Sequence, residues 1–291
     1  MSTRTISWRR LALGINFIGF GVFALLTTLG ILPWSFWLGA AALWPVLLIA
    51  AGLRLVFERS AFPWAVLASP LLIQGTLAFA ATHEAPSFDG QWVALRAEHS
   101  EAAERWALDA ELALASLDVR ARSLPEGVLA EGRAAVRGGS PRLAVRDQGG
   151  DSPRVRWRHG GSDLHVLGRE RQRWEMDVTR DLPVNADFDL AFVRGRLDLE
   201  GAPVDRFHLD GAFIDIALVL GVPTRDTRVD LDGAFNSFDV EVPAGTPVRV
   251  RSDGALITVE GRADAGELEG PAYDLRFSGF CSRVKVHSLP R

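Results

Sequence analysis

The sequence predicts a chain of two parts: a membrane α-helical hairpin with a third span, joined to an all-β repeat domain. Three observations lead to this fold class. Residues 11–57 carry a single charged side chain, Arg54, whereas the later part of the 291-residue chain is rich in Arg, Asp and Gly. The early part consists of apolar runs long enough for membrane helices. The later part repeats a short motif at intervals of 21 or 22 residues, with apolar residues at alternate positions.

The first part contains three apolar runs that we interpret as spans. They lie at about residues 11–32, 36–57 and 62–81. A helix of about 20 apolar residues crosses a hydrocarbon core of about 30 Å. Pro33 and Trp34 separate the first two runs, which suits a tight hairpin with aromatic residues at the membrane interface. The third run is weaker because it contains Pro70 and Gln74. A cleaved signal peptide is disfavoured, because the first run is too long and a second span follows at once.

Arginine placement predicts the orientation of these spans, because basic residues prefer the cytoplasmic side of a membrane. The tail, residues 1–10, contains three arginines, and Arg54 and Arg59 lie between the second and third runs. We expect both segments in the cytoplasm. Three crossings of the cytoplasmic (inner) membrane would then place the C-terminal domain outside it. If the third run does not cross, the same domain is cytoplasmic.

A connector at residues 83–105 is expected to lead into the β domain, residues 106–291. The spans and their short loops would then occupy residues 11–82. At the junction, a helix over residues 101–115 is an open alternative, because Ala, Glu and Leu favour helices.

The β domain is expected to be a β-solenoid or a related stack. The sequence Leu-Asp-Gly-Ala-Phe at 209–213 recurs at 231–235, and partial copies begin at Asp189 and Asp253. Each unit suggests a strand, an Asp-Gly corner and a second strand, because Gly permits positive φ and Asp caps its own backbone. One such unit cannot bury a core alone, whereas stacked units can. Phe213 and Phe235 are therefore predicted to occupy equivalent buried sites.

Both parts resemble a known family. Leu29–Pro33 and the Leu-Trp-Pro-containing segment Leu43–Ile49 are similar to the LiaI–LiaF-like transmembrane region. Leu114–Leu117, Trp174–Val178 and the Asp-Gly-Ala units resemble the toastrack β domain of LiaF-like proteins. The resemblance implies a membrane-anchored accessory protein of envelope-stress signalling. Such proteins modulate partner membrane proteins, including sensor kinases, without catalysing a reaction.

Motifs for catalysis and metal binding were sought without success. The sequence has no phosphate-binding loop, and its six histidines show no metal-ligand spacing. The repeated aspartates could in principle form a calcium-binding ladder, but turn capping explains them better because the glycine-rich nonapeptide of calcium-binding β-rolls is absent. Cys281 is interpreted as a buried structural thiol. We therefore predict no catalytic residue, cofactor or metal.

Two sets of residues are candidates for contact with a partner. They are Trp44, Pro45 and Gly52 in the second span, and Arg154, Arg156 and Arg158 in the β domain. Small residues let helices approach closely in lipid, either within the hairpin or against a partner span. The arginines belong to residues 133–173, which contain ten arginines and four acids. This basic segment is either a solvated face or a surface for anionic lipid or an anionic envelope polymer. Nucleic acid is disfavoured because aromatic residues are sparse there.

The sequence therefore predicts a non-enzymatic membrane regulator or sensor that acts through protein contact, with membrane lipids and a second membrane protein as partners. Two alternatives stay open. One is a membrane-anchored scaffold that assembles through its β-stack. The other is a polysaccharide-acting enzyme, which would require carboxylates clustered on one exposed face.

Overall fold

The computed structural model divides the chain into a helical unit within residues 1–87 and a β unit that begins at residue 88. The residues it describes are 8–28, 32, 36, 44–58, 67–82, 91–99, 103–136, 140–160, 172–261 and 270–289. The two units are considered separately.

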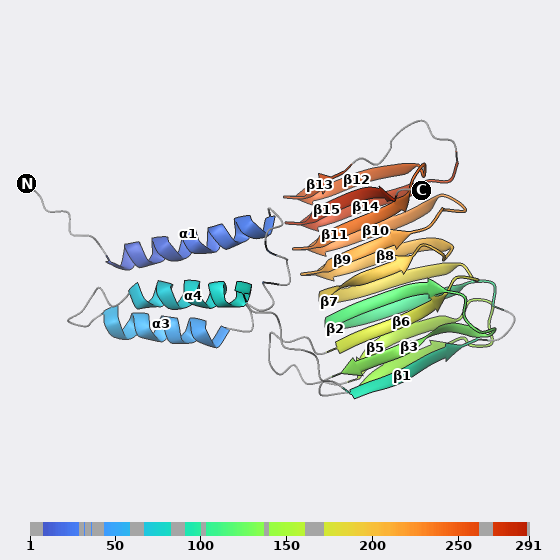
Figure 1. The fold of residues 1–291 in the computed structure, drawn as a ribbon, viewed down its shortest axis with the longest axis horizontal. Helices are drawn as coiled ribbons and strands as arrows, with labels where there is room; N and C mark the ends of the chain where they lie inside the picture. Colours follow the sequence, from blue (N-terminus) through green and yellow to red (C-terminus); the bar gives the residue numbers. More distant parts are fainter. Residues whose placement is uncertain are drawn as a thin grey trace, which may run out of the picture. The chain divides into compact units, whose positions relative to one another are not determined.

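The helical unit contains α1 (Trp8–Thr28), α3 (Trp44–Glu58) and α4 (Ala68–Thr82) (Figure 1). Helix α4 packs against both α1 and α3. Gly19 permits the first contact, because the side chain of Gln74 fills the space that a Cβ at Gly19 would need. Ala12, Ala50 and Leu77 are buried within the unit. A short helical unit is therefore present where the apolar runs were expected.

The described helices do not show the three full-length spans that the sequence predicted. Among the described residues, no helix combines the length and the apolar character needed to cross a membrane. Helices α3 and α4 have 15 residues each, and the flanking residues 37–43 and 59–66 lie outside the described part of the chain.

The described residues of the β unit form fifteen strands, in this order along the chain: β1 (Gln91–Glu98), β2 (Trp106–Arg122), β3 (Val128–Val136), β4 (Ser140–Arg146), β5 (Arg154–Gly160), β6 (Gln172–Thr179), β7 (Val184–Leu199), β8 (Val204–Ala212), β9 (Asp215–Leu220), β10 (Thr227–Ala234), β11 (Ser237–Pro243), β12 (Val248–Ala255), β13 (Thr258–Glu260), β14 (Tyr273–Phe280) and β15 (Arg283–Leu289).

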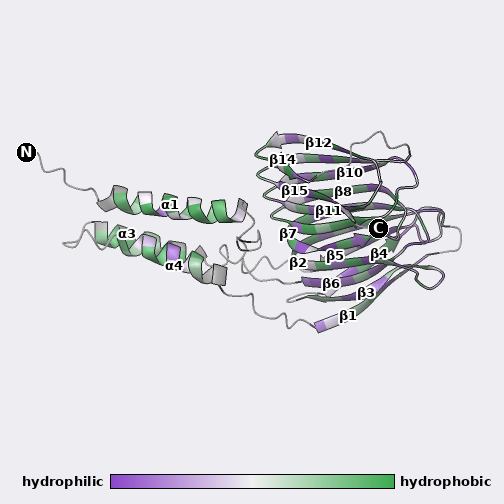
Figure 2. Cartoon of the chain, turned by 45° about the horizontal axis from the view of Figure 1, so that its top comes forward, coloured by the Kyte–Doolittle hydropathy of each residue, from purple (hydrophilic) through white to green (hydrophobic). Residues whose placement is uncertain are grey.

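These strands form two layers that share the long strands β2 and β7. The first layer has the order β4-β5-β2-β7-β8-β10-β14-β12, and the second has the order β1-β3-β6-β2-β7-β9-β11-β15-β13. Apolar and polar residues alternate along the strands (Figure 2). Inward side chains from both layers, such as Phe207 and Leu209 on β8 and Ile216 and Leu218 on β9, belong to one continuous core. The all-β repeat domain predicted from sequence is confirmed.

The sequence repeat corresponds to the rungs of this stack. Strands β8 and β10 are parallel, with Leu209 beside Leu231 and Gly211 beside Gly233. Strands β7 and β8 continue the same register, with Asp189 beside Asp210. Identical sequence positions therefore lie one above another, as the 22-residue interval predicted.

The stacking order departs from the chain order at the C-terminal end. Strand β14 lies between β10 and β12, so Ser278 separates Asp232 from Asp253. The unit that contains Asp253 was expected to follow Asp232 directly, because both carry Asp-Gly-Ala. The final turn of the chain instead fills that place with Ser278-Gly279-Phe280.

In the rungs of β7, β8 and β10, the corner lies at an aromatic residue rather than at Asp-Gly, whereas Leu256 and Cys281 hold the corners that follow β12 and β14. Phe192, Phe213 and Phe235 have φ values of 57°, 57° and 58°. Their rings stack, with centroids 4.8 Å and 4.9 Å apart. Gly211 and Gly233 do have positive φ, 156° and 119°, as predicted, and a Cβ at either position would also collide with a carbonyl oxygen of the neighbouring strand. Phe213 and Phe235 do occupy equivalent sites, but the sites are half-buried rather than buried.

The predicted connector also needs correction. Strand β1 lies inside residues 83–105 and pairs with β3, so the sheet begins at Gln91. Most of β1 is exposed, and its sequence therefore lacks the alternation that reveals a half-buried strand. The helical alternative over residues 101–115 is wrong, since β2 begins at Trp106.

Candidate interaction face of the β-stack

The outward side chains of the first layer form a polar surface that we call the ladder face. On β8, Phe207 and Leu209 are buried, whereas Arg206, His208 and Asp210 point outward. The neighbouring strands are parallel and in register, so outward residues line up in rows across them. Strands in a sheet are about 4.8 Å apart, which brings the charges of one row close together.

One row of the ladder face runs across β2, β7, β8, β10, β14 and β12, and all of its residues except one are acidic. It consists of Glu111, Asp189, Asp210, Asp232, Ser278 and Asp253. Partial desolvation raises the pKa of Asp189, and the negative charges of Asp187, Asp210 and Glu111 raise it further. The repeated aspartates therefore do converge on one face, which the sequence alone could not decide.

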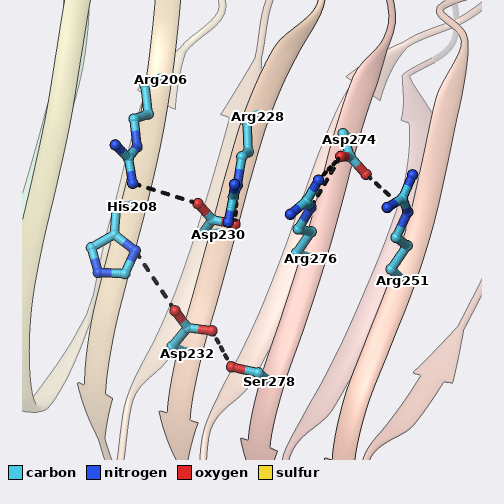
Figure 3. A network of polar contacts seen from close by, with 9 residues as sticks. All are labelled: Arg206, His208, Arg228, Asp230, Asp232, Arg251, Asp274, Arg276 and Ser278. Atoms are coloured by element: carbon cyan, nitrogen blue, oxygen red, sulfur yellow. Dashed lines mark hydrogen bonds and ion pairs between the residues drawn. The ribbon is translucent and has the colours of Figure 1, made fainter.

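Closer to the C-terminal end, cations neutralise the acids (Figure 3). Asp230 is almost fully buried and accepts from Arg228 at 2.7 Å, while Arg206 lies 3.9 Å away. Asp274 lies 2.7 Å from Arg276 and 3.6 Å from Arg251. The hydrogen bond from Arg276 is the main cause of the lowered pKa of Asp274.

Asp232 has two polar neighbours on this face. Its carboxylate lies 3.7 Å from Nδ1 of His208 and accepts a hydrogen bond from Ser278 (Figure 3). These contacts join β8, β10 and β14, so the ladder face is a continuous polar network over the last rungs.

The three predicted arginines meet at the opposite end of the same face. Arg154 and Arg156 lie 3.7 Å and 3.4 Å from Asp109, and Arg158 donates to Glu111 at 2.6 Å. The hydrogen bond from Arg158 lowers the pKa of Glu111. These arginines share one surface and are ion-paired with β2, and their role in contact with a partner stays a prediction.

Sequence reasoning missed two further arginines of this surface. Arg142 and Arg146 on β4 lie directly opposite Arg158 and Arg154 on β5. Neither has an ion-pair partner among the described residues. Like charges placed opposite each other destabilise a sheet, which favours an anion nearby. Part of the signal was present, because β5 carries arginine at every second position and β4 carries two arginines four positions apart, on either side of a segment that contains Gly-Gly.

The other predicted contact residues belong to the helical unit. Trp44 and Pro45 open α3, where proline is tolerated because the first turn needs no intrahelical N–H bond. Gly52 lies further along α3, and among the described residues no atom outside its own helix backbone and chain neighbours lies within 4 Å of the position that a Cβ would take. The described residues therefore leave room for another helix beside α3 at this point.

The remaining histidines and Cys281 were considered as possible metal ligands or nucleophiles. In the part of the chain that the structure describes, no group of three His, Cys, Asp or Glu side chains could hold a metal ion. His287 faces a single carboxylate, Asp239, at 3.4 Å. Cys281 is half-buried rather than fully buried, and desolvation raises the pKa of its thiol.

Comparison with known proteins gives one family and one fold. Residues 11–56 match the family described as the LiaI-LiaF-like transmembrane region. A solved structure from Clostridium sporogenes, described as a "putative cell adhesion protein", aligns with a TM-score of 0.58 and 12% identity, over 69% of this chain and 100% of that chain. At this identity the likeness shows the fold alone. No curated protein matches the chain.

Proposed function

We propose that this chain is a non-enzymatic, membrane-anchored regulator or sensor of the cell-envelope stress response, and that it acts by protein–protein contact. The observation that carries the proposal is the match of residues 11–56 to the LiaI-LiaF-like transmembrane region, continuous with a β-stack. The family points to membrane association and a regulatory role. The stress response and the contact mechanism are inferences from it.

The surface of the helical unit supports membrane anchoring. Phe17, Ile18, Leu55, Val56 and Leu71 are all largely exposed. Water-soluble proteins seldom leave so many large apolar side chains uncovered, whereas lipid would cover them. We propose three crossings at about residues 11–32, 36–57 and 62–81 of the cytoplasmic membrane. With the arginine-rich segments in the cytoplasm, three crossings would put the β unit outside.

Topology can be tested with reporters fused after His287. Alkaline phosphatase, which works only after export, should be active at this position. Activity of a reporter that functions only in the cytoplasm would overturn the proposed orientation and favour two crossings.

The proposed partner is a second membrane protein such as a sensor kinase. The room that the described residues leave beside α3 at Gly52 offers a surface for a partner helix. The arginines of β4 and β5 offer a second contact for an anionic lipid or envelope polymer, because Arg142 and Arg146 have no ion pair among the described residues. The two units would then have separable roles, one in placement and one in recognition.

A deletion strain complemented with variants tests the regulatory role. Loss of the β unit, or of residues 43–49, should abolish the transcriptional response to membrane-active or wall-active agents. Single substitutions such as Cys281→Ser or His208→Ala should leave it largely intact. A deletion strain that matches its parent under every agent would refute the regulatory role. If the protein instead turns over a substrate, and replacing one acidic residue of the ladder face abolishes that turnover, the protein is an enzyme.

A structural scaffold is the second candidate, and the exposed last rung favours it. Strand β12 ends the first layer and β13 ends the second. Among the described residues, no further strand covers either edge. Assembly of detergent-solubilised protein into long polymers, visible by electron microscopy, would favour the scaffold over the regulator.

A further inference from the structure

The C-terminal end of the β-stack presents an open strand edge. Strand β12 pairs with β14 on one side, and no described strand pairs with its other side. Residues 251–255 of β12 are all exposed, and the corner that follows leaves Leu256 71% exposed. An edge of this kind offers a row of unpaired N–H and C=O groups to another strand.

This edge lacks the devices that usually prevent strand addition. Residues 248–255 contain no proline and no lysine. Their pairing with β14 continues without a bulge from Val248 to Ala255. The edge strand β4 differs, since it carries Pro141, which cannot donate to a partner strand. The open edge is therefore suited to pairing.

The charges on β12 are arranged so that the strand complements itself. Arg251 and Asp253 both point to the ladder face, as their neighbours Arg276 and Ser278 do. In an antiparallel pair, residues directly opposite each other point to the same side of the sheet. A two-fold axis must therefore pass through a residue of β12 rather than between two residues.

We propose that β12 pairs antiparallel with β12 of a second copy of this chain, about a two-fold axis at Ser252. Arg251 of each copy then faces Asp253 of the other. The interaction is isologous, so it forms dimers and closes without further growth.

Other positions of the axis are less favourable. An axis at Arg251 places Arg251 opposite its own copy, and an axis at Val250 places Arg249 opposite Arg251. An axis at Asp253 brings two carboxylates together. Like charges directly opposite one another destabilise a sheet. An axis at Arg251 also pairs Arg249 with Asp253, but it leaves the two copies of Arg251 directly opposite each other. The axis at Ser252 pairs Arg251 with Asp253 and places no like charges directly opposite.

A single strand pair buries less than the roughly 1,000 Å² that a stable interface requires, so the dimer is expected to be weak and concentration-dependent. Covalent trapping suits such an interface. Residues opposite each other in an antiparallel pair have Cα atoms about 4.5–5.5 Å apart, which a disulfide can bridge.

The register is tested by cysteine crosslinking of the full chain in detergent, in a Cys281→Ser background. Ser252→Cys should form a disulfide-linked dimer under copper–phenanthroline. Arg249→Cys alone should not, because its counterpart lies about 20 Å away, six residues along the strand. A mixture of Arg249→Cys and Ala255→Cys should crosslink. Absence of the Ser252→Cys dimer at about 100 µM, or equal crosslinking of Arg249→Cys alone, would overturn the proposal.

Charge exchange provides an independent test that does not use oxidation. Asp253→Arg alone and Arg251→Asp alone each place like charges opposite one another, so each should weaken dimerisation by about tenfold in sedimentation equilibrium. Mixing the two variants restores both ion pairs and should recover the dimer. Circular dichroism confirms that each variant is folded. Equal dimerisation of the wild type and both single variants would refute this interface.

Discussion

The two ends of the β-stack are built differently. At the N-terminal end, antiparallel strands cover the parallel rungs: β4 pairs with β5, and β1 pairs with β3. Arg133 lies over the ring of Trp92 on β1 at 4.5 Å from its centroid. At the C-terminal end, the last rung remains parallel and exposed. Repeat proteins need capping units at their ends. The difference shows that a cap can be recognised by a change of strand direction.

The largest expected contrast between the ends lies in the core. Trp157 and Trp174 are fully buried near the N-terminal end, with stacked rings 6.3 Å apart. Trp174→Ala should lower the free energy of unfolding by about 3–5 kcal/mol. Val259→Ala, on the exposed strand β13, should change it by less than about 0.5 kcal/mol. Thermal unfolding of the two variants measures the contrast, and equal losses would mean that both ends are equally packed.

A polar contact holds the corner that precedes the open end. Asn236 is fully buried, its side-chain oxygen accepts from the amide of Ile214 at 3.2 Å, and its Nδ2 donates to the carbonyl of Gly211 at 3.1 Å. Asn236→Ala leaves both groups without this partner and should cost about 2–3 kcal/mol. Denaturant unfolding measures the loss. A variant as stable as the wild type would show that the corner does not depend on this side chain.

The phenylalanine ladder should weaken towards the open end. Phe213 stacks between two rings, whereas Phe280 meets Phe235 edge-on and is 45% exposed. Phe213→Ala should cost about 1–3 kcal/mol, less than a fully buried Phe because the site is half-exposed, and Phe280→Ala should cost less still. Phe207→Ala, in the core, is the reference for full burial. A larger loss for Phe280→Ala than for Phe213→Ala would reverse the gradient.

The features of the β-stack that could be predicted from sequence are those marked by a local pattern of residues. The interval between residues 209 and 231 predicted parallel rungs, because identical residues stack in register. The insertion of β14 between β10 and β12 was not predictable, because Ser278-Gly279-Phe280 shares only its glycine with Asp-Gly-Ala. The corner was placed at Asp-Gly, just before the phenylalanine that holds it, because both the glycine and the phenylalanine have positive φ and the sequence does not show at which of them the chain turns.

The candidate site was predictable to a similar extent. Arginine content identified Arg154, Arg156 and Arg158, but the pairing of β4 with β5 was needed to add Arg142 and Arg146. The ion pairs of Arg154, Arg156 and Arg158 with Asp109 and Glu111 depend on contacts between residues 45 or 47 positions apart. Strand pairing over such distances leaves no mark in local composition. The role of Trp44, Pro45 and Gly52 stays a prediction.

The smallest expected effect concerns the acidic row between the two ends. The folded-state pKa of Asp189 is raised by desolvation and by Asp187, Asp210 and Glu111. A carboxyl with a raised pKa destabilises the fold when it is ionised, and this penalty disappears as the pH falls through the raised pKa. Asp189→Asn should therefore raise the melting temperature at pH 7 by about 1–2 °C, and the gain should vanish in the acid range. Asp253→Asn, beside Ser278 at the open end, is the matched control and should show no such gain. If Asp189→Asn lowers the melting temperature at pH 7, repulsion along the row does not limit stability.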